Sequence, residues 1–209
     1  MTNTLHRRGT PEGLQEDFIV FALTAKGHNR KDAAPKIKKF IELALKHNPN
    51  SISSSSFYSY ETGTDWSKVY DGVVDNSHAA ANFSDLRSVK NFISVLKEAD
   101  LGICINVSGL LEQVRQCCSE VGISRHSVEH SLGIIGKRDM LPNNQVLELN
   151  TMCGHGMVSF NLIAKVIEHV KLGKIDVKKG ALLLAKPCMC GAFNTVRAAK
   201  LLDMARDSF

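Results

Sequence analysis

Apolar residues along the chain occur in continuous runs and in helically spaced patterns. The segments 17–25 and 100–107 are nearly continuous apolar runs of strand length, which is typical of strands buried on both faces. The segments 30–47 and 84–99 repeat apolar residues every three to four positions, which predicts amphipathic helices. Ser84 is the expected N-cap of the second of these helices.

Two further strands are predicted between these helices. Residues 51–60, SISSSSFYSY, alternate in part and carry aromatic residues, and residues 68–75 have the composition of another short strand. The first six elements therefore follow the order βαββαβ, which is the order of ferredoxin-like folds.

The second half of the chain continues the alternation of helices and strands. It predicts helices at 108–122, 156–173 and 192–209, and strands at 125–136, 145–150 and 180–187. The fold class is thus α/β or α+β, a mixed sheet covered by helices. Residues 1–16 form a polar N-terminal lead-in, followed by a single domain over 17–209, which divides at most into two intertwined halves, 17–107 and 108–209.

Composition narrows the class of protein. The chain has 209 residues, of which 44% are hydrophobic, enough to bury a core without disulfides. A net charge of +5 without a basic, aromatic-rich stretch argues against nucleic-acid binding. The N-terminus lacks the apolar core of a signal peptide, and no apolar run approaches the ~20 residues that span a bilayer. We therefore expect a cytoplasmic protein that binds neither nucleic acid nor a membrane.

Small loops between predicted strands and helices are the candidate binding positions. If the strands are parallel, these loops meet at one edge of the sheet, where open α/β sheets bind ligands. The loop after the first strand carries Lys26 and His28, and the loop after residue 185 carries Lys186, so these three are the candidate ligand-binding residues. The four loops are 24–29, 108–109, 152–156 and 186–191.

Cysteines in two of these loops suggest a metal site. In a reducing compartment, clustered cysteines are better explained by metal or redox chemistry than by disulfides. Cys153, Cys188 and Cys190 are the expected ligands, with Cys118 or His155 as the fourth. Such a set suits zinc or an iron–sulfur cluster, although no C-x2-C pair is present.

Cys153 also fits a second class of function, a cysteine-dependent enzyme. It precedes a predicted helix, whose N-terminus would lower the pKa of the thiol, and His155 is the candidate base. The residues MCGHG (152–156) resemble the first active-site motif of proline racemases. The second motif of those enzymes is of the DCG type, and the corresponding triplet here, Met189-Cys190-Gly191, lacks the aspartate, so the sequence is not assigned to that family.

A third hypothesis assigns the cysteines no chemistry. Free cysteine packs as a small hydrophobe, so a structural or ligand-binding α/β module is compatible with the same pattern. The expected partners are a small molecule or a metal, together with a second copy of the chain in a homo-oligomer. The sequence leaves open whether the protein is an enzyme.

Overall fold

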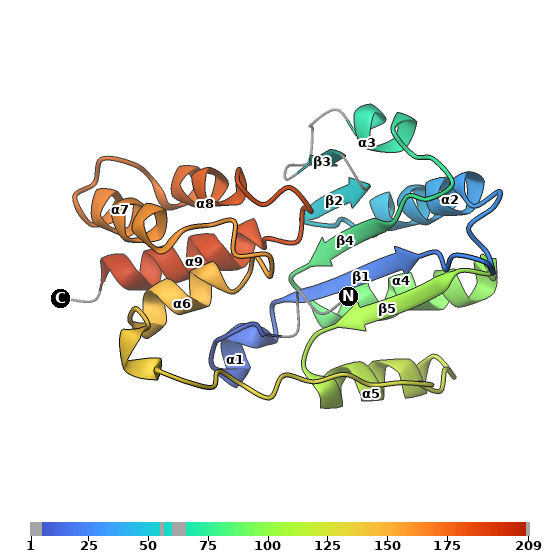
Figure 1. Cartoon of the computed structure of the whole chain (residues 1–209), viewed down its shortest axis with the longest axis horizontal. Coiled ribbons are helices and arrows are strands. Elements are labelled where there is room, and N and C mark those ends of the chain that lie inside the picture. The colour runs from blue at the N-terminus through green and yellow to red at the C-terminus, as the bar shows by residue number, and fades with distance from the viewer. Residues whose placement is uncertain (1–5, 55–56, 60–65, 208–209) are drawn as a thin grey trace.

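A single five-stranded sheet forms the centre of the protein (Figure 1). The computed structural model describes residues 6–54, 57–59 and 66–207. The strand order is β3-β2-β4-β1-β5, and every pair of neighbours in the sheet is antiparallel. The strands are β1 (Phe18–Leu23), β2 (Ser51–Ser54), β3 (Phe57–Ser59), β4 (Ala79–Phe83) and β5 (Cys104–Ser108).

Helices cover both faces of the sheet. Those of the C-terminal part of the chain, α6 to α9, make up a purely helical half of the molecule. In Figure 1, α6 to α9 gather on one side of the molecule, and the sheet lies on the other side with α2 and α4. Within the part of the chain that is described, none of the helices is both long and apolar enough to cross a membrane. The helices are α1 (Pro11–Leu14), α2 (Ala34–Leu45), α3 (Ser67–Asp71), α4 (Leu86–Ala99), α5 (Leu111–Glu120), α6 (Asn144–Asn150), α7 (Phe160–Lys171), α8 (Val177–Ala185) and α9 (Thr195–Arg206), with a 3-10 turn at Arg138–Met140.

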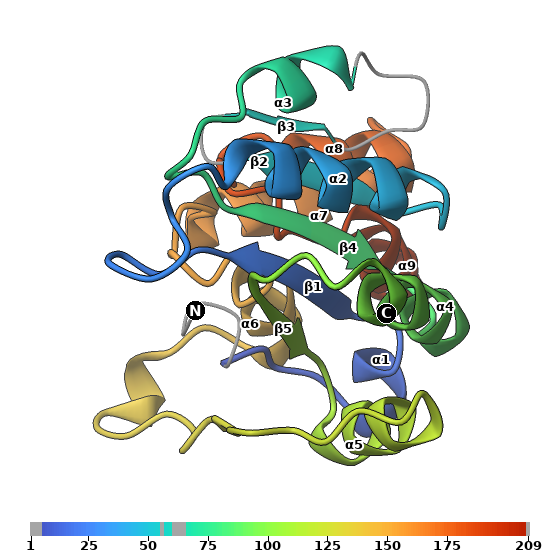
Figure 2. The ribbon, with the colours of Figure 1, turned by 90° about the vertical axis from the view of Figure 1, so that its right-hand side faces the viewer.

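The central strand β1 explains why both faces of the sheet are covered. Alternate side chains of a strand point to opposite faces. Phe18 and Val20 pack into one apolar cluster with α2 and α4, whereas Ile19 and Phe21 pack into another with α6 to α9. Figure 2 accordingly shows α2 on one side of the sheet and α7 and α8 on the other. The core therefore has two layers of helices with the sheet between them.

The prediction of a mixed α/β fold with helices covering a sheet is confirmed. The ferredoxin-like order is not confirmed as predicted. The elements from β1 to β5 follow βαββαβαβ, because the serine-rich segment 51–60 contains both β2 and β3, with residues 55–56 and 60 outside the described part. The strand β4 lies between the predicted elements 68–75 and 84–99, where the sequence predicts neither a strand nor a helix.

Four predicted strands are wrong. Helices α3, α6 and α8 occupy much of three of these segments, namely 68–75, 145–150 and 180–187. The fourth segment, 125–136, has no regular structure. Short apolar runs do not distinguish a buried strand from a buried helix. The decisive local signals are caps: Asn143 accepts a hydrogen bond from the N–H of Val146 at the start of α6.

Caps also fix the starts of α8 and α4. Asp176 accepts from the N–H of Lys179 at 2.8 Å, which starts α8 immediately before the apolar run that had the appearance of a strand. The N-cap of α4 is Asp85 rather than Ser84, because the Asp85 carboxylate accepts from the N–H of Ser88 at 2.7 Å. Of the four predicted strand-to-helix loops, only 24–29 and 108–109 follow a strand, whereas 152–156 and 186–191 each join two helices.

Candidate thiol site

Two cysteine-bearing loops lie side by side between the helical half and the sheet. The first cysteine loop (residues 151–159) joins α6 to α7, and the second (186–194) joins α8 to α9. The Sγ atoms of Cys188 and Cys190 are 3.7 Å apart, and the thiol of Cys153 hydrogen-bonds to Cys188. Cys153, Cys188 and Cys190 therefore form one group, called here the three-thiol cluster.

The two loops are built on the same four-residue turn, C-x-x-G. The N–H of Gly156 donates to the carbonyl of Cys153 at 2.9 Å, and the N–H of Gly191 donates to the carbonyl of Cys188 at 3.2 Å. Both glycines adopt the left-handed conformation, with φ of 69° and 64°. This is a conformation that glycine adopts without steric cost, so the sequence itself specifies both turns.

Serine side chains from the sheet hold the second cysteine loop in place. The hydroxyl of Ser51 donates to the carbonyl of Gly191 at 2.7 Å, and that of Ser53 donates to the carbonyl of Cys190 at 2.8 Å. Asn82 of β4 donates from Nδ2 to the carbonyl of Ala192 at 3.3 Å. These three side chains lie on the sheet face that meets the helical half. Their hydrogen bonds to the loop explain why β2 and β4 carry polar residues although they are buried.

Arg7 links the two loops from the N-terminal segment. Its Nη2 donates to the carbonyls of Met152 at 3.2 Å and Ala192 at 2.5 Å, one in each loop. The same guanidinium forms an ion pair with Asp17, which also pairs with Arg197 at 2.9 Å. Arg7, within the segment predicted to be a polar lead-in, therefore contributes a buried charge to the junction of the two halves.

The three thiols differ in exposure and in acidity. Cys153 and Cys188 are 2% and 0% exposed, whereas Cys190 is only partly buried. A hydrogen bond from Cys188, aided by the N–H of Ala192, lowers the pKa of Cys190 to about 7 against the opposing effect of burial. The hydrogen bond to Cys188, together with burial, raises the pKa of Cys153 well above its usual range. Of Cys153 and Cys190, Cys190 is therefore the thiol that ionises more readily.

Cys153 is not at a helix N-terminus, contrary to the prediction. Helix α7 is capped by Ser159, six residues beyond Cys153, so its dipole does not act on this thiol. The nearest donors are the backbone N–H groups of His155 and Met157, which only partly offset the rise in the Cys153 pKa. The His155 ring is exposed. The pKa of His78 is lowered mainly by burial and, to a smaller extent, by the nearby charge of His155.

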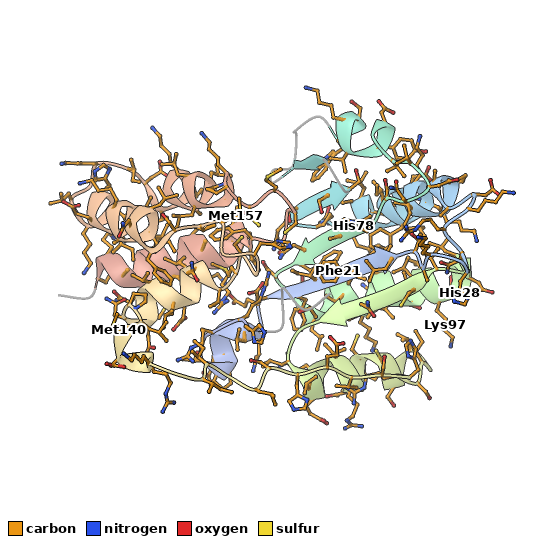
Figure 3. The ribbon with its side chains drawn as sticks, viewed as in Figure 1. Phe21, His28, His78, Lys97, Met140 and Met157 are labelled. Atoms are coloured by element: carbon orange, nitrogen blue, oxygen red, sulfur yellow. The ribbon has the colours of Figure 1, made fainter. Side chains whose placement is uncertain are left out.

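The remaining predicted site residues do not join the cluster. Cys118 lies in α5 and packs into the apolar layer formed with α2 and α4, on the other face of the sheet. Lys26 and His28 are exposed in the loop after β1, and in Figure 3 His28 lies well away from Met157 of the first cysteine loop. Lys186 is exposed at the end of α8, two residues before Cys188.

A separate cleft of about 410 Å³ runs along β5. Cys104 and Cys118 line it, together with Asn106, Ser108 and Arg125, and no residue of the three-thiol cluster does. Burial raises the pKa of Cys118, so this thiol stays protonated at neutral pH. The cleft along β5 is therefore separate from the three-thiol cluster.

The described residues include no group of three or more His, Cys, Asp or Glu side chains arranged to hold a metal ion. All six cysteines are free thiols. The arrangement provides two sulfurs in contact, one of them acidic and accessible, and a third sulfur behind them.

Comparisons of the chain with models of known protein families, with curated proteins and with solved structures find no match.

Proposed function

We propose that this protein catalyses thiol–disulfide exchange, with Cys190 as the attacking thiolate and Cys188 as the thiol that completes the reaction. The observation that carries the proposal is the 3.7 Å contact between the two sulfurs, one of them accessible. A cytoplasmic location, in which thiols are kept reduced, suits this activity.

The reaction uses groups already in place. The Cys190 thiolate attacks one sulfur of a substrate disulfide, and the other substrate sulfur leaves as a thiolate that takes a proton from water. Cys188 then loses its proton and attacks the Cys190 sulfur, which releases the second substrate thiolate and forms the Cys188–Cys190 disulfide. The substrate gains two electrons and the protein loses two, and a small thiol of a reducing compartment must return them to Cys188–Cys190 before the next turnover.

Cys190 is preferred over Cys153 as the nucleophile for two reasons. Attack requires the thiolate, and the pKa of Cys190 is about 7 whereas that of Cys153 is raised far above the ordinary range. Attack also requires access, and Cys153 is 2% exposed. Cys153 is left as a buried thiol behind the reacting pair.

The test is the reaction of the reduced protein with bis(2-hydroxyethyl) disulfide, followed by release of free mercaptoethanol. Cys190→Ser should abolish release, and Cys188→Ser should stop the reaction at a mixed disulfide on Cys190, visible as added mass. Cys104→Ser, which alters a partly buried cysteine outside the cluster, is the matched control and should react like the unaltered protein. Full activity of Cys190→Ser would exclude the proposal.

A second candidate function is the binding of a soft metal ion by the same thiols, as the sequence suggested. The favouring observation is again the sulfur–sulfur separation of 3.7 Å, because two sulfurs bound ~2.3 Å from one zinc ion lie at a similar separation. Titration of the reduced protein with Zn²⁺ or Cu⁺ tests it. Thiolate-to-metal absorption that disappears in Cys188→Ser supports metal binding, and its absence at equimolar metal excludes it.

A further inference from the structure

We propose that Cys153 is a third catalytic thiol that receives the disulfide from the outer pair, so that oxidation passes inward from Cys188–Cys190 to Cys153–Cys188. This inference rests on the proposed function and adds a second, intramolecular exchange to it. It predicts that the oxidised protein again carries a free thiol at Cys190.

The geometry places Cys188 between the other two cysteines. It contacts Cys190 with its sulfur at 3.7 Å and is hydrogen-bonded to the thiol of Cys153. A single sulfur in contact with two others is the arrangement that exchange requires, because the attacking sulfur must reach one partner while the other partner leaves. Exposure falls from Cys190, which is partly buried, to Cys188, which is fully buried.

The inward step balances without any external oxidant. Cys153 gives its proton to water, and its sulfur forms a bond to the sulfur of Cys188. The Cys188–Cys190 bond breaks, and its electron pair leaves with Cys190 as a thiolate. One thiol and one disulfide are present before and after the step, so the protein as a whole is neither oxidised nor reduced by it.

The local environment favours the inward direction. Cys190 is the better leaving group, because the N–H of Ala192 stabilises its thiolate and its pKa is about 7. A disulfide whose reduced form is stabilised in this way is the more oxidising one, so it tends to be reduced in favour of another disulfide. The backbone N–H groups of His155 and Met157 act to lower the pKa of Cys153 but only partly offset the rise caused by Cys188 and burial, so the inward attack starts from a mostly protonated thiol and is the slower of the two exchanges.

The consequence is a protein that stores one disulfide in its core while keeping its reactive thiolate at the partly exposed Cys190. A thiol enzyme with only two cysteines is inactive towards disulfides once oxidised. With three, the oxidised form can still make a mixed disulfide at Cys190 with a second substrate molecule.

The experiment maps the disulfide formed by one equivalent of bis(2-hydroxyethyl) disulfide. After reaction, free thiols are alkylated with iodoacetamide and the chain is cleaved with cyanogen bromide, which cuts after methionine. Met152, Met157 and Met189 separate the three cysteines onto different fragments. We expect fragments 153–157 and 158–189 to be joined and fragment 190–204 to carry the alkyl group.

The outcomes separate this inference from the proposed function. A disulfide found between fragments 158–189 and 190–204, with Cys153 alkylated, would overturn the inward transfer but keep thiol–disulfide exchange. No oxidation at any of the three cysteines would overturn both proposals. Cys153→Ala, which avoids placing a hydroxyl in the core, should lose alkylation of Cys190 in the oxidised protein, whereas Cys104→Ala should retain it.

Discussion

Arg7 and Asp17 form an ion pair that is almost completely withdrawn from solvent, with side chains 6% and 0% exposed. The same Arg7 guanidinium donates to carbonyls in both cysteine loops, while Asp17 also binds Arg197 of α9. A buried charge is tolerated only where it is paired and hydrogen-bonded. The pair thus ties the position of the thiols to the N-terminal segment, to β1 and to α9.

Replacing Arg7 tests this connection. Arg7→Ala should lower the free energy of unfolding by about 3 kcal/mol, because a buried carboxylate and two carbonyls lose a donor together. Urea unfolding measures the change. Arg7→Lys should recover only part of it, since an ammonium lacks the planar fork that reaches several acceptors at once.

The matched control is Arg115→Ala. Arg115 pairs with Glu112 three residues away on the exposed face of α5, where solvent screens the interaction, so unfolding should hardly change. If Arg7→Ala were as stable as Arg115→Ala, Arg7 would not be a structural link between the loops. The rate at which Cys190 is alkylated should also fall in Arg7→Ala. Arg7 holds the carbonyl of Ala192, and the N–H of Ala192 helps to lower the pKa of Cys190.

The pH dependence of alkylation tests the hydrogen bond between Cys188 and Cys190. Iodoacetamide reacts with the thiolate, so the rate at Cys190 should rise about tenfold per pH unit below pH 7 and level off above it, because the pKa of Cys190 is about 7. Cys188→Ala removes the largest cause of this lowered pKa. The midpoint should therefore move upward, towards the value of about 8.5 of an ordinary thiol.

Rates are followed at Cys190 by mass spectrometry of the alkylated fragments. Cys104→Ala serves as the control and should leave the midpoint near 7, because Cys104 lies in β5 outside the cluster. A midpoint that stays near 7 in Cys188→Ala would mean that the Cys188 thiol does not set the acidity of Cys190.

Much of the N-terminal half can be predicted from apolar periodicity alone. Helix α4 lies within its predicted segment because Val89, Phe92, Ile93 and Leu96 are buried at helical spacing. Strand β4 escapes such prediction. Its first three residues are alanines, which favour helices intrinsically and are selected here for small size between two layers of helices.

The cysteines of the site could be named from the sequence, but their surroundings could not. The prediction that the loops at Cys153 and Cys188 meet rested on parallel strands that do not exist, since both loops join helices. The repeated C-x-x-G turn was the better local signal. Arg7 was missed because its acceptors are 145 and 185 residues away, a distance at which no spacing pattern operates.

Ser51 and Ser53 should contribute measurably to the stability of the second cysteine loop. Each hydroxyl donates to a loop carbonyl, and a buried carbonyl that loses its donor costs about 1 to 2 kcal/mol. Ser51→Ala and Ser53→Ala should each lower the free energy of unfolding by this amount in urea titrations. Ser124→Ala, at an exposed loop position, should not. Equal stability of all three variants would contradict the role of these hydroxyls.

The left-handed turn of the first cysteine loop leads to a prediction that distinguishes two neighbouring glycines. Gly156 has φ of 69°, and a Cβ added there meets no atom within 4 Å, so any cost of Gly156→Ala comes from the backbone alone. That cost is about 1 to 2 kcal/mol for an L-residue. Gly154, two residues earlier in the same loop, does not have a positive φ, so the same substitution there carries no such backbone cost.

Thermal or urea unfolding of Gly156→Ala and Gly154→Ala provides the comparison. We expect Gly156→Ala to be the less stable variant and to show altered alkylation of Cys190, because the turn positions Cys153 against Cys188. An unchanged stability of Gly156→Ala would mean that the loop adopts a different turn in solution. A loss of alkylation at equal stability would instead show that the turn acts on the thiols rather than on the fold.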